Sequence, residues 1–196
     1  MKQIILFSCL LIAFFSTAAQ EKPEGLFINS KAPDFKLKDQ NGAEVSLKEL
    51  RKKGPVVILF YRGNWCPYCN KELKRFQDSL QFITDKGATL VAITPEAAEG
   101  VSKTIEKTGA AFPILYDADL KVSKGYAVTF NVDEKTAARY KNFGNDLMVI
   151  NQQKGKVVLP VPAVYVVNRD GAVTYRFFDS DYKKRPNVSD ILAELK

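Results

Sequence analysis

The sequence contains no histidine, and this absence removes several kinds of catalytic site at once. Serine–histidine and cysteine–histidine pairs need an imidazole as the base, and histidine is also a common zinc ligand. The 196 residues include three cysteines, of which two, Cys66 and Cys69, lie outside the N-terminal apolar run. Two cysteines supply only half of a four-ligand zinc site. A nucleophile in this protein must therefore be activated by a helix end, a basic neighbour or another thiol.

A long apolar run occurs only at the N-terminus. Lys2 precedes the run, which extends from residue 4 to residue 15, and the small residues 16–19 follow it. Positive charge, apolar segment and small residues, in that order, are typical of a secretory signal peptide. A membrane anchor is the weaker alternative, because the run is shorter than the roughly 20 residues that span a bilayer. We expect residues 1–19 to be removed and residues 20–196 to form one secreted or periplasmic domain, free of the membrane.

The charge pattern gives no indication of a nucleic-acid-binding surface. There are 29 Lys and Arg residues against 22 Asp and Glu, a formal net charge of +7. The lysines are scattered among acids, as in residues 34–39, and the largest basic cluster, Lys183 to Arg185, is followed at once by Pro186. An ordinary solvated surface explains this pattern, and we expect no nucleic-acid partner.

Strand and helix patterns alternate along the chain. Continuous β-branched and aromatic runs at 56–61 and 89–94 are typical of strands covered on both faces. A helical spacing of apolar residues leads from the cysteine pair to Gly87. Further helices are expected at residues 47–53, 96–108, 120–126, 133–140 and 187–195, the last capped by Asn187, and further strands at 112–116, 163–167 and 173–178.

Turn signals complete the predicted fold. Asn41-Gly42 predicts an N-terminal hairpin, and Arg169-Asp170-Gly171 predicts a second hairpin near the C-terminus. Residues 127–159 have the least regular pattern, and we expect an insertion there. Strands that alternate with helices and end in a hairpin predict an α/β domain with a mixed central sheet flanked by helices.

Cys66-Pro67-Tyr68-Cys69 follows a predicted strand and opens a predicted helix. Pro67 suits a first helical turn, where its missing amide hydrogen has no partner to lose. Residues three apart share one helix face, so the two sulfurs are close enough for a disulfide. The free amides and dipole of the helix start stabilise a thiolate at Cys66. We expect Cys66 to have the lower pKa and to be the more accessible cysteine.

Other interpretations of this pair are weaker. A structural disulfide suits an exported protein, but it would close a loop of only four residues and stabilise little. Two inert core cysteines would not explain the strand–Cys-x-x-Cys–helix context. We expect thiol redox chemistry in which Cys66 and Cys69 are the catalytic residues, with neither a metal nor a cofactor.

The stretch from Phe60 to Leu73, F-Y-R-G-N-W-C-P-Y-C-N-K-E-L, resembles the active-site segment of peroxiredoxin-like proteins in the alkyl hydroperoxide reductase C/thiol-specific antioxidant family. The resemblance covers the whole chain after the signal and includes residues 32–35, 159–163 and 179–182. It implies a thioredoxin-like fold and reduction of hydroperoxides by a cysteine that a dithiol donor, such as a thioredoxin-like protein, later restores.

The sequence also departs from that family. Its typical members carry a Pro-x-x-x-Thr-x-x-Cys signature that ends in the peroxidatic cysteine. Here Arg62 stands at the proline, Cys66 at the threonine and Cys69 at the peroxidatic cysteine. The family's later arginine falls on Pro162, so two usual partners of the peroxide are missing. Arg62 either supplies the lost positive charge or pairs with an acid on the surface.

Three residues are expected to contact the substrate: Arg62, Trp65 beside the dithiol, and Pro162. In a thioredoxin-type fold the position of Pro162 is that of a cis-proline that faces the dithiol, although a proline at the start of a strand is also a common structural choice.

Two enzymatic functions fit the cysteine pair. In the first, a thiolate reduces a hydroperoxide, and the resulting sulfenic acid condenses with the other cysteine to a disulfide. In the alternative, a protein disulfide oxidoreductase, Cys66 attacks a disulfide substrate, Cys69 resolves the intermediate and Pro162 shapes the docking groove. A copper(I) carrier is the least favoured function, because a third ligand is lacking.

The mature protein is predicted to begin at Gln20, because a signal peptidase cleaves after small residues. Mass spectrometry of protein purified from its native host should show a chain that starts at this residue. An intact Met1 on protein from the cytoplasm would contradict both the signal and the compartment.

Overall fold

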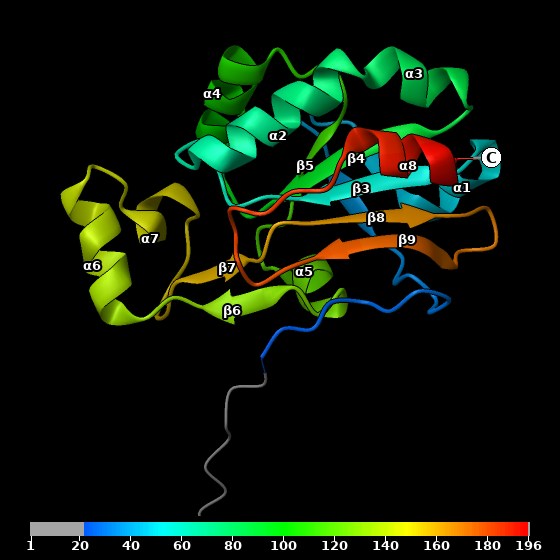
Figure 1. Cartoon of the computed structure of the whole chain (residues 1–196). Coiled ribbons are helices and arrows are strands. Elements are labelled where there is room, and N and C mark those ends of the chain that lie inside the picture. Colours follow the sequence, from blue (N-terminus) through cyan, green and yellow to red (C-terminus); the bar gives the residue numbers. More distant parts are fainter. Residues whose placement is uncertain (1–21, 196) are drawn as a thin grey trace, which may run out of the picture.

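The computed structural model describes residues 22–195 and shows a central sheet with helices on both faces (Figure 1). The order of its strands is β5-β4-β3-β8-β9. Strands β3, β4 and β5 are parallel, whereas β8 is antiparallel to both β3 and β9. The mixed sheet is therefore confirmed. The strands are β3 (Val56–Phe60), β4 (Thr89–Thr94), β5 (Ile114–Tyr116), β8 (Ala163–Val167) and β9 (Val173–Phe178).

Two hydrophobic layers, one on each face of the sheet, hold the helices in place. Successive side chains of β3 point to opposite faces, and all five are buried. Val57 and Leu59 belong to the layer that contains α2 (Pro67–Asp78), α4 (Ala98–Thr108) and α8 (Val188–Glu194). Residues 56, 58 and 60 of the same strand belong to the opposite layer, with α1 (Leu47–Lys53) and α5 (Lys121–Gly125).

The helix after the cysteines differs from its prediction. Instead of one helix to Gly87, the chain forms α2 and then α3 (Leu80–Asp85), with Ser79 between them at φ −105° and ψ 5°. Serine competes for backbone hydrogen bonds and favours helix ends over helix interiors. The buried Ile83 keeps α3 in the same hydrophobic layer as α2.

The N-terminal hairpin is present. Strands β1 (Lys36–Lys38) and β2 (Glu44–Ser46) are antiparallel. The carboxylate of Asp39 accepts hydrogen bonds from the backbone N–H groups of Asn41 and Ala43, at 2.8 and 2.9 Å, and so stabilises the turn.

The insertion is more regular than its sequence indicates. Strands β6 (Thr129–Asn131) and β7 (Val158–Pro160) pair antiparallel at its base, and they enclose α6 (Glu134–Asn142) and α7 (Leu147–Ile150). A separate apolar cluster of Val132, Leu147, Val157 and Leu159 holds it together, and Trp65 packs against this cluster. The insertion therefore forms one wall beside the cysteines.

Two further details bear on the predictions. Asn187 precedes α8, but its side chain makes no capping hydrogen bond, so the predicted cap is wrong. Within residues 22–195, no helix has both the length and the apolar character needed to cross a membrane. The expected signal, residues 1–19, lies outside the part of the chain that the structure describes.

Candidate active site

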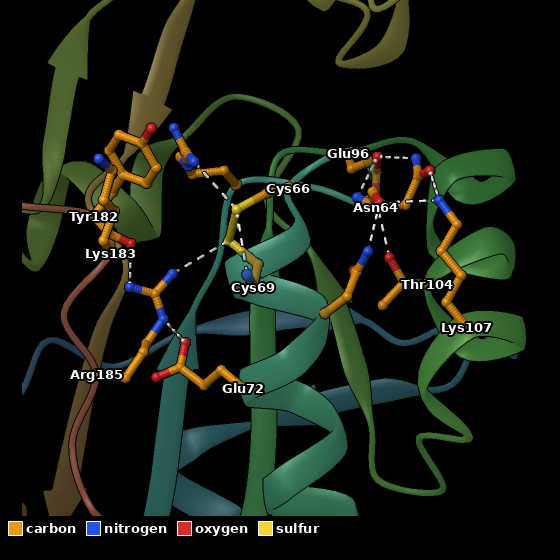
Figure 2. The surroundings of a disulfide bond; sticks show 12 residues. Asn64, Cys66, Cys69, Glu72, Glu96, Thr104, Lys107, Tyr182, Lys183 and Arg185 are labelled. Carbon is orange, nitrogen blue, oxygen red and sulfur yellow. Dashed lines mark hydrogen bonds and ion pairs between the residues drawn. A yellow bond between two sulfur atoms is a disulfide. The ribbon is translucent and has the colours of Figure 1, made fainter.

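The cysteine pair lies where β3 passes into α2 (Figure 2). Cys66 is the N-cap of α2, in extended backbone conformation, and Pro67 is the first helical residue. Cys66 and Cys69 form a disulfide, with their Cα atoms 5.3 Å apart. Both residues are fully buried, so the greater accessibility expected for Cys66 is not found in the disulfide form.

Two N–H groups point at the sulfur of Cys66. The backbone N–H of Cys69 donates to Cys66 Sγ at 3.3 Å, and Nη2 of Arg62 donates to the same atom at 3.2 Å. Hydrogen bonds and positive charge at a sulfur favour the thiolate over the thiol. After reduction, this arrangement stabilises negative charge on Cys66.

Arg62 is buried, with only 4% of its surface exposed, so its alternative interpretation as a surface arginine is wrong. Its Nη1 donates to the hydroxyl of Tyr140 at 3.3 Å. The guanidinium group also lies over two aromatic rings, 4.0 Å from the centroid of Tyr182 and 5.0 Å from that of Trp65. Burial lowers the pKa of Arg62, and the hydroxyl of Tyr140 opposes that shift. Aromatic faces stabilise the buried cation by cation–π attraction.

Cys69 has an arginine of its own. Nη2 of Arg185 lies 3.7 Å from Cys69 Sγ, and Nε of Arg185 lies 2.7 Å from Oε2 of Glu72 (Figure 2). The side chains of this ion pair are 8% and 3% exposed. The interpretation of the basic cluster as solvated surface is therefore wrong for Arg185, although Lys184 does pair with Asp179 at the surface.

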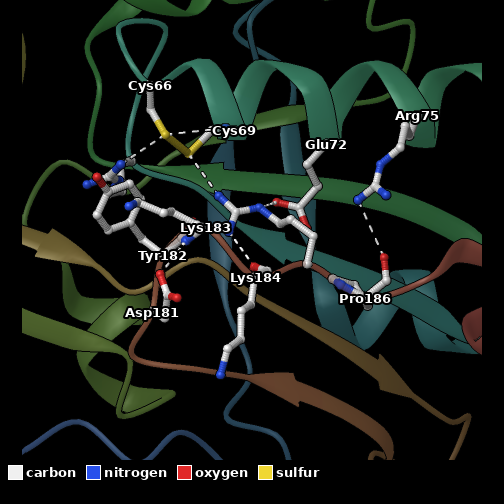
Figure 3. Close-up of polar contacts among 11 residues, drawn as sticks. Cys66, Cys69, Glu72, Arg75, Asp181, Tyr182, Lys183, Lys184 and Pro186 are labelled. Atoms are coloured by element: carbon white, nitrogen blue, oxygen red, sulfur yellow. Dashed lines mark hydrogen bonds and ion pairs between the residues drawn. A yellow bond between two sulfur atoms is a disulfide. The ribbon is translucent and has the colours of Figure 1, made fainter.

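The chain around Pro186 turns Arg185 inward. Pro186 is buried, and its carbonyl oxygen accepts a hydrogen bond at 3.4 Å from Nη2 of Arg75, on α2 (Figure 3). Further along, Ile191 and Leu195 of the following segment are buried in the layer that contains α2. The end of the chain is thus anchored against the helix that carries Cys69.

The three residues expected to contact the substrate lie close together. Arg62 and Pro162 share a cavity of about 250 Å³ with Tyr140 and Tyr182. Trp65 lies beside it, with its ring 4.8 Å from that of Tyr140. The peptide bond before Pro162 is trans, so the expected cis-proline is wrong. Pro162 follows Pro160 and Val161 at the end of β7, and Val161 N donates to Val128 O, which ties this segment to the insertion.

Comparison with known proteins identifies the family. The profile of the AhpC/TSA family matches residues 28–176. The chain belongs to the AhpC/TSA family. Peroxiredoxin Q of Sedum lineare, a chloroplastic protein, is 33% identical over 188 residues, which cover 94% of this chain and 88% of that relative. Peroxiredoxin Bcp of Bacillus subtilis is 25% identical over 169 residues, covering 86% of this chain and 94% of the relative.

This AhpC/TSA protein is also similar to a disulfide-exchange protein. The thiol-disulfide oxidoreductase ResA of Bacillus subtilis is 32% identical over 107 residues, which cover 54% of this chain and 59% of ResA. Among solved structures, peroxidoxin BcpB of Mycobacterium tuberculosis has a TM-score of 0.68 at 23% identity and covers 86% of this chain and 95% of its own. The predicted thioredoxin-like fold is confirmed.

Sequence reasoning missed the residues that reach the site from elsewhere in the chain. Tyr140, Tyr182 and Arg185 are distant from the cysteines in sequence, and no spacing rule connects them. Glu72 could have been found, because Cys66, Cys69 and Glu72 recur every three residues and share a helix face. In the described range, residues 22–195, no group of three or more metal-binding side chains is found.

Glu72 should make the protein less stable as the pH rises through the weakly acidic range. Burial raises the pKa of Glu72 from 4.5 to about 7, against the attraction of Arg185. Between these values the folded protein keeps a proton that the unfolded chain releases, so stability falls as pH rises. The shift corresponds to about 3 kcal/mol of unfolding free energy.

Urea unfolding of the wild type and Glu72→Gln from pH 4 to pH 8 measures this effect. The loss of stability between pH 4.5 and 7 should be present in the wild type, absent in Glu72→Gln and unchanged in Glu106→Gln, which alters an exposed glutamate. Equal pH profiles for the wild type and Glu72→Gln would show that the pKa of Glu72 is the same in the folded and unfolded states, and would contradict the raised pKa.

Proposed function

We propose that this protein is a thiol-dependent peroxidase that reduces hydroperoxides through a Cys66/Cys69 dithiol–disulfide cycle. The observation that carries the proposal is the presence of one guanidinium group at each sulfur, Arg62 at Cys66 and Arg185 at Cys69. Such groups stabilise a thiolate, and they also stabilise charge that develops on the oxygens during attack. The relatives named peroxiredoxin support the same assignment.

The cycle balances with a hydroperoxide and an external dithiol. A thiolate attacks the terminal oxygen of ROOH, an S–O bond forms, the O–O bond breaks, and ROH leaves after it takes up a proton. The second cysteine then attacks the sulfenic sulfur, so the disulfide forms and water leaves. A dithiol donor reduces the disulfide and is itself oxidised.

We assign the first attack to Cys66. Its sulfur has two donors within 3.3 Å, whereas Cys69 Sγ has the more distant Arg185, at 3.7 Å. Cys66 also caps α2, where the free amides of the helix start favour negative charge. The assignment departs from the family signature, in which the peroxidatic cysteine stands at Cys69.

A protein disulfide oxidoreductase is the second candidate, and the similarity to ResA favours it. Burial of both sulfurs in the disulfide form does not separate the two functions, because a protein must reach the sulfurs in either cycle: a dithiol donor in the first, a disulfide substrate in the second. We propose a thioredoxin-like dithiol protein as the donor and a secreted or periplasmic location.

Stopped-flow fluorescence can decide between the two functions, because Trp65 is the only tryptophan and adjoins Cys66. Micromolar hydroperoxide should oxidise the reduced protein within seconds. Cys69→Ser should trap a sulfenic acid on Cys66, whereas Cys66→Ser, which lacks the attacking thiolate, should not react at this rate. Arg62→Met should slow the reaction by about 10²-fold to 10³-fold, the usual cost of a lost transition-state donor.

Arg139→Met is the matched control, since Arg139 is exposed on α6 next to Tyr140, and its rate should equal that of the wild type. Peroxide oxidation no faster than that of a free thiol, together with ready reduction of insulin disulfides, would replace the peroxidase with the disulfide oxidoreductase.

A further inference from the structure

Glu96 is a buried acid that the peroxidase cycle leaves unexplained. It follows β4 and is fully buried. Its two carboxylate oxygens lie 2.9 and 3.0 Å from the backbone N of Asn64, and Oε1 lies 2.5 Å from Asn64 Nδ2. The hydroxyl of Thr104 lies 3.4 Å from Oε2 (Figure 2). A fully buried carboxylate is unfavourable unless hydrogen bonds replace its contacts with water, and here the loop before the cysteines donates those hydrogen bonds.

Asn64 is also hydrogen-bonded to two helices. Its carbonyl oxygen accepts from Nδ2 of Asn70, on α2, at 2.7 Å. The ammonium group of Lys107, on α4, donates at 3.0 Å to both the carbonyl oxygen and Oδ1 of Asn64. Every hydrogen-bonding group of Asn64 is therefore in use, and the loop is fixed between α2 and α4.

Two glycines leave the space that the carboxylate occupies. A Cβ atom at Gly100 would overlap the side chain of Glu96. At Gly63, where φ is +150°, a Cβ atom would lie 2.8 Å from Oε1 of Glu96 and 2.5 Å from Nε1 of Trp65. The backbone is thus built closely around this side chain, and a larger residue at either glycine would displace it.

The loop held by Glu96 carries the groups that act on the sulfur. Arg62 and Gly63 directly precede Asn64, and the backbone N–H of Cys66 donates to the carbonyl of Gly63 at 3.1 Å. A shift of the Gly63–Asn64 turn would move the guanidinium of Arg62 and the N-cap of α2 relative to each other. Both groups stabilise negative charge on Cys66 Sγ, so their alignment determines how stable the Cys66 thiolate is.

We propose that Glu96 is a positioning residue that holds the Gly63–Asn64 turn and so fixes Arg62 against Cys66. The effect of Glu96 on catalysis rests on the proposed peroxidase function. Its effect on the Cys66 thiolate can be measured in the reduced protein without peroxide. Glu96→Gln keeps the shape and replaces one accepting oxygen with an NH₂ group. The turn then loses one of its charge-assisted contacts.

The test measures the thiolate without peroxide. The rate of iodoacetamide alkylation of Cys66 is followed against pH, by peptide mapping, in reduced protein. In Glu96→Gln we expect the midpoint to rise by about half a pH unit or more, because Arg62 stabilises the thiolate less well. Glu99→Gln is the matched control, since Glu99 lies on α4, is exposed and pairs with Lys103 of the same helix at the surface. Its midpoint should not move.

Two further variants keep the result interpretable. Asn64→Ala removes the side-chain part of the same contact from the other side and should raise the midpoint as well, even if Glu96→Gln fails to fold. The midpoint shift of the double variant should be smaller than the sum of the two single-variant shifts, because both substitutions remove the same contact. Peroxide oxidation of Glu96→Gln should be about 10-fold to 100-fold slower, the cost expected of a misplaced catalytic group.

The outcomes separate this proposal from the peroxidase. A wild-type alkylation midpoint in both Glu96→Gln and Asn64→Ala would overturn the positioning role. Raised midpoints in a protein that does not react with peroxide would support the positioning role and leave only the peroxidase contradicted. Fully additive shifts in the double variant would also contradict the positioning role, because Glu96 would then affect Cys66 independently of its contact with Asn64.

Discussion

The structure depends on a disulfide that is buried together with positive charge. In a protein without histidine, a helix start and two guanidinium groups replace the usual base. Arg62 lies against Cys66, and Arg185 lies against Cys69. Burying two cations is unfavourable unless each is compensated. Glu72 compensates Arg185 as an ion pair where it is ionised, above its pKa of about 7, whereas aromatic rings and a tyrosine hydroxyl compensate Arg62.

The groups around the disulfide come from three parts of the fold. Tyr140 comes from the insertion, Tyr182 and Arg185 come from the segment between β9 and α8, and Glu72 comes from α2 itself. The central sheet supplies the frame, since β3 leads directly into the cysteines and β4 leads to Glu96. The insertion and the C-terminal segment both lie beside the cysteines and supply groups that contact Arg62 or Cys69.

Local sequence patterns predicted the central strands and the cysteine pair, whereas contacts between residues distant in sequence determine the surroundings of that pair. Uninterrupted β-branched runs identified β3 and β4, and the spacing of Cys66 and Cys69 identified the redox pair. The inward turn of Arg185 could not be predicted, because it depends on Pro186 packing against α2, far away in sequence. The pairing of β6 with β7 was missed because no tight turn joins these strands, in contrast to β1 and β2, which are equally short but flank Asn41-Gly42.

The midpoint reduction potential of the Cys66–Cys69 pair tests the account most directly. If guanidinium groups stabilise the thiolates, they favour the reduced form and raise the potential. Arg62→Met and Arg185→Met should then each have a more negative potential than the wild type at pH 7, by about 30 mV for each 1.4 kcal/mol of lost stabilisation. Equal potentials in all three proteins would contradict the claim that these arginines set the chemistry of the pair.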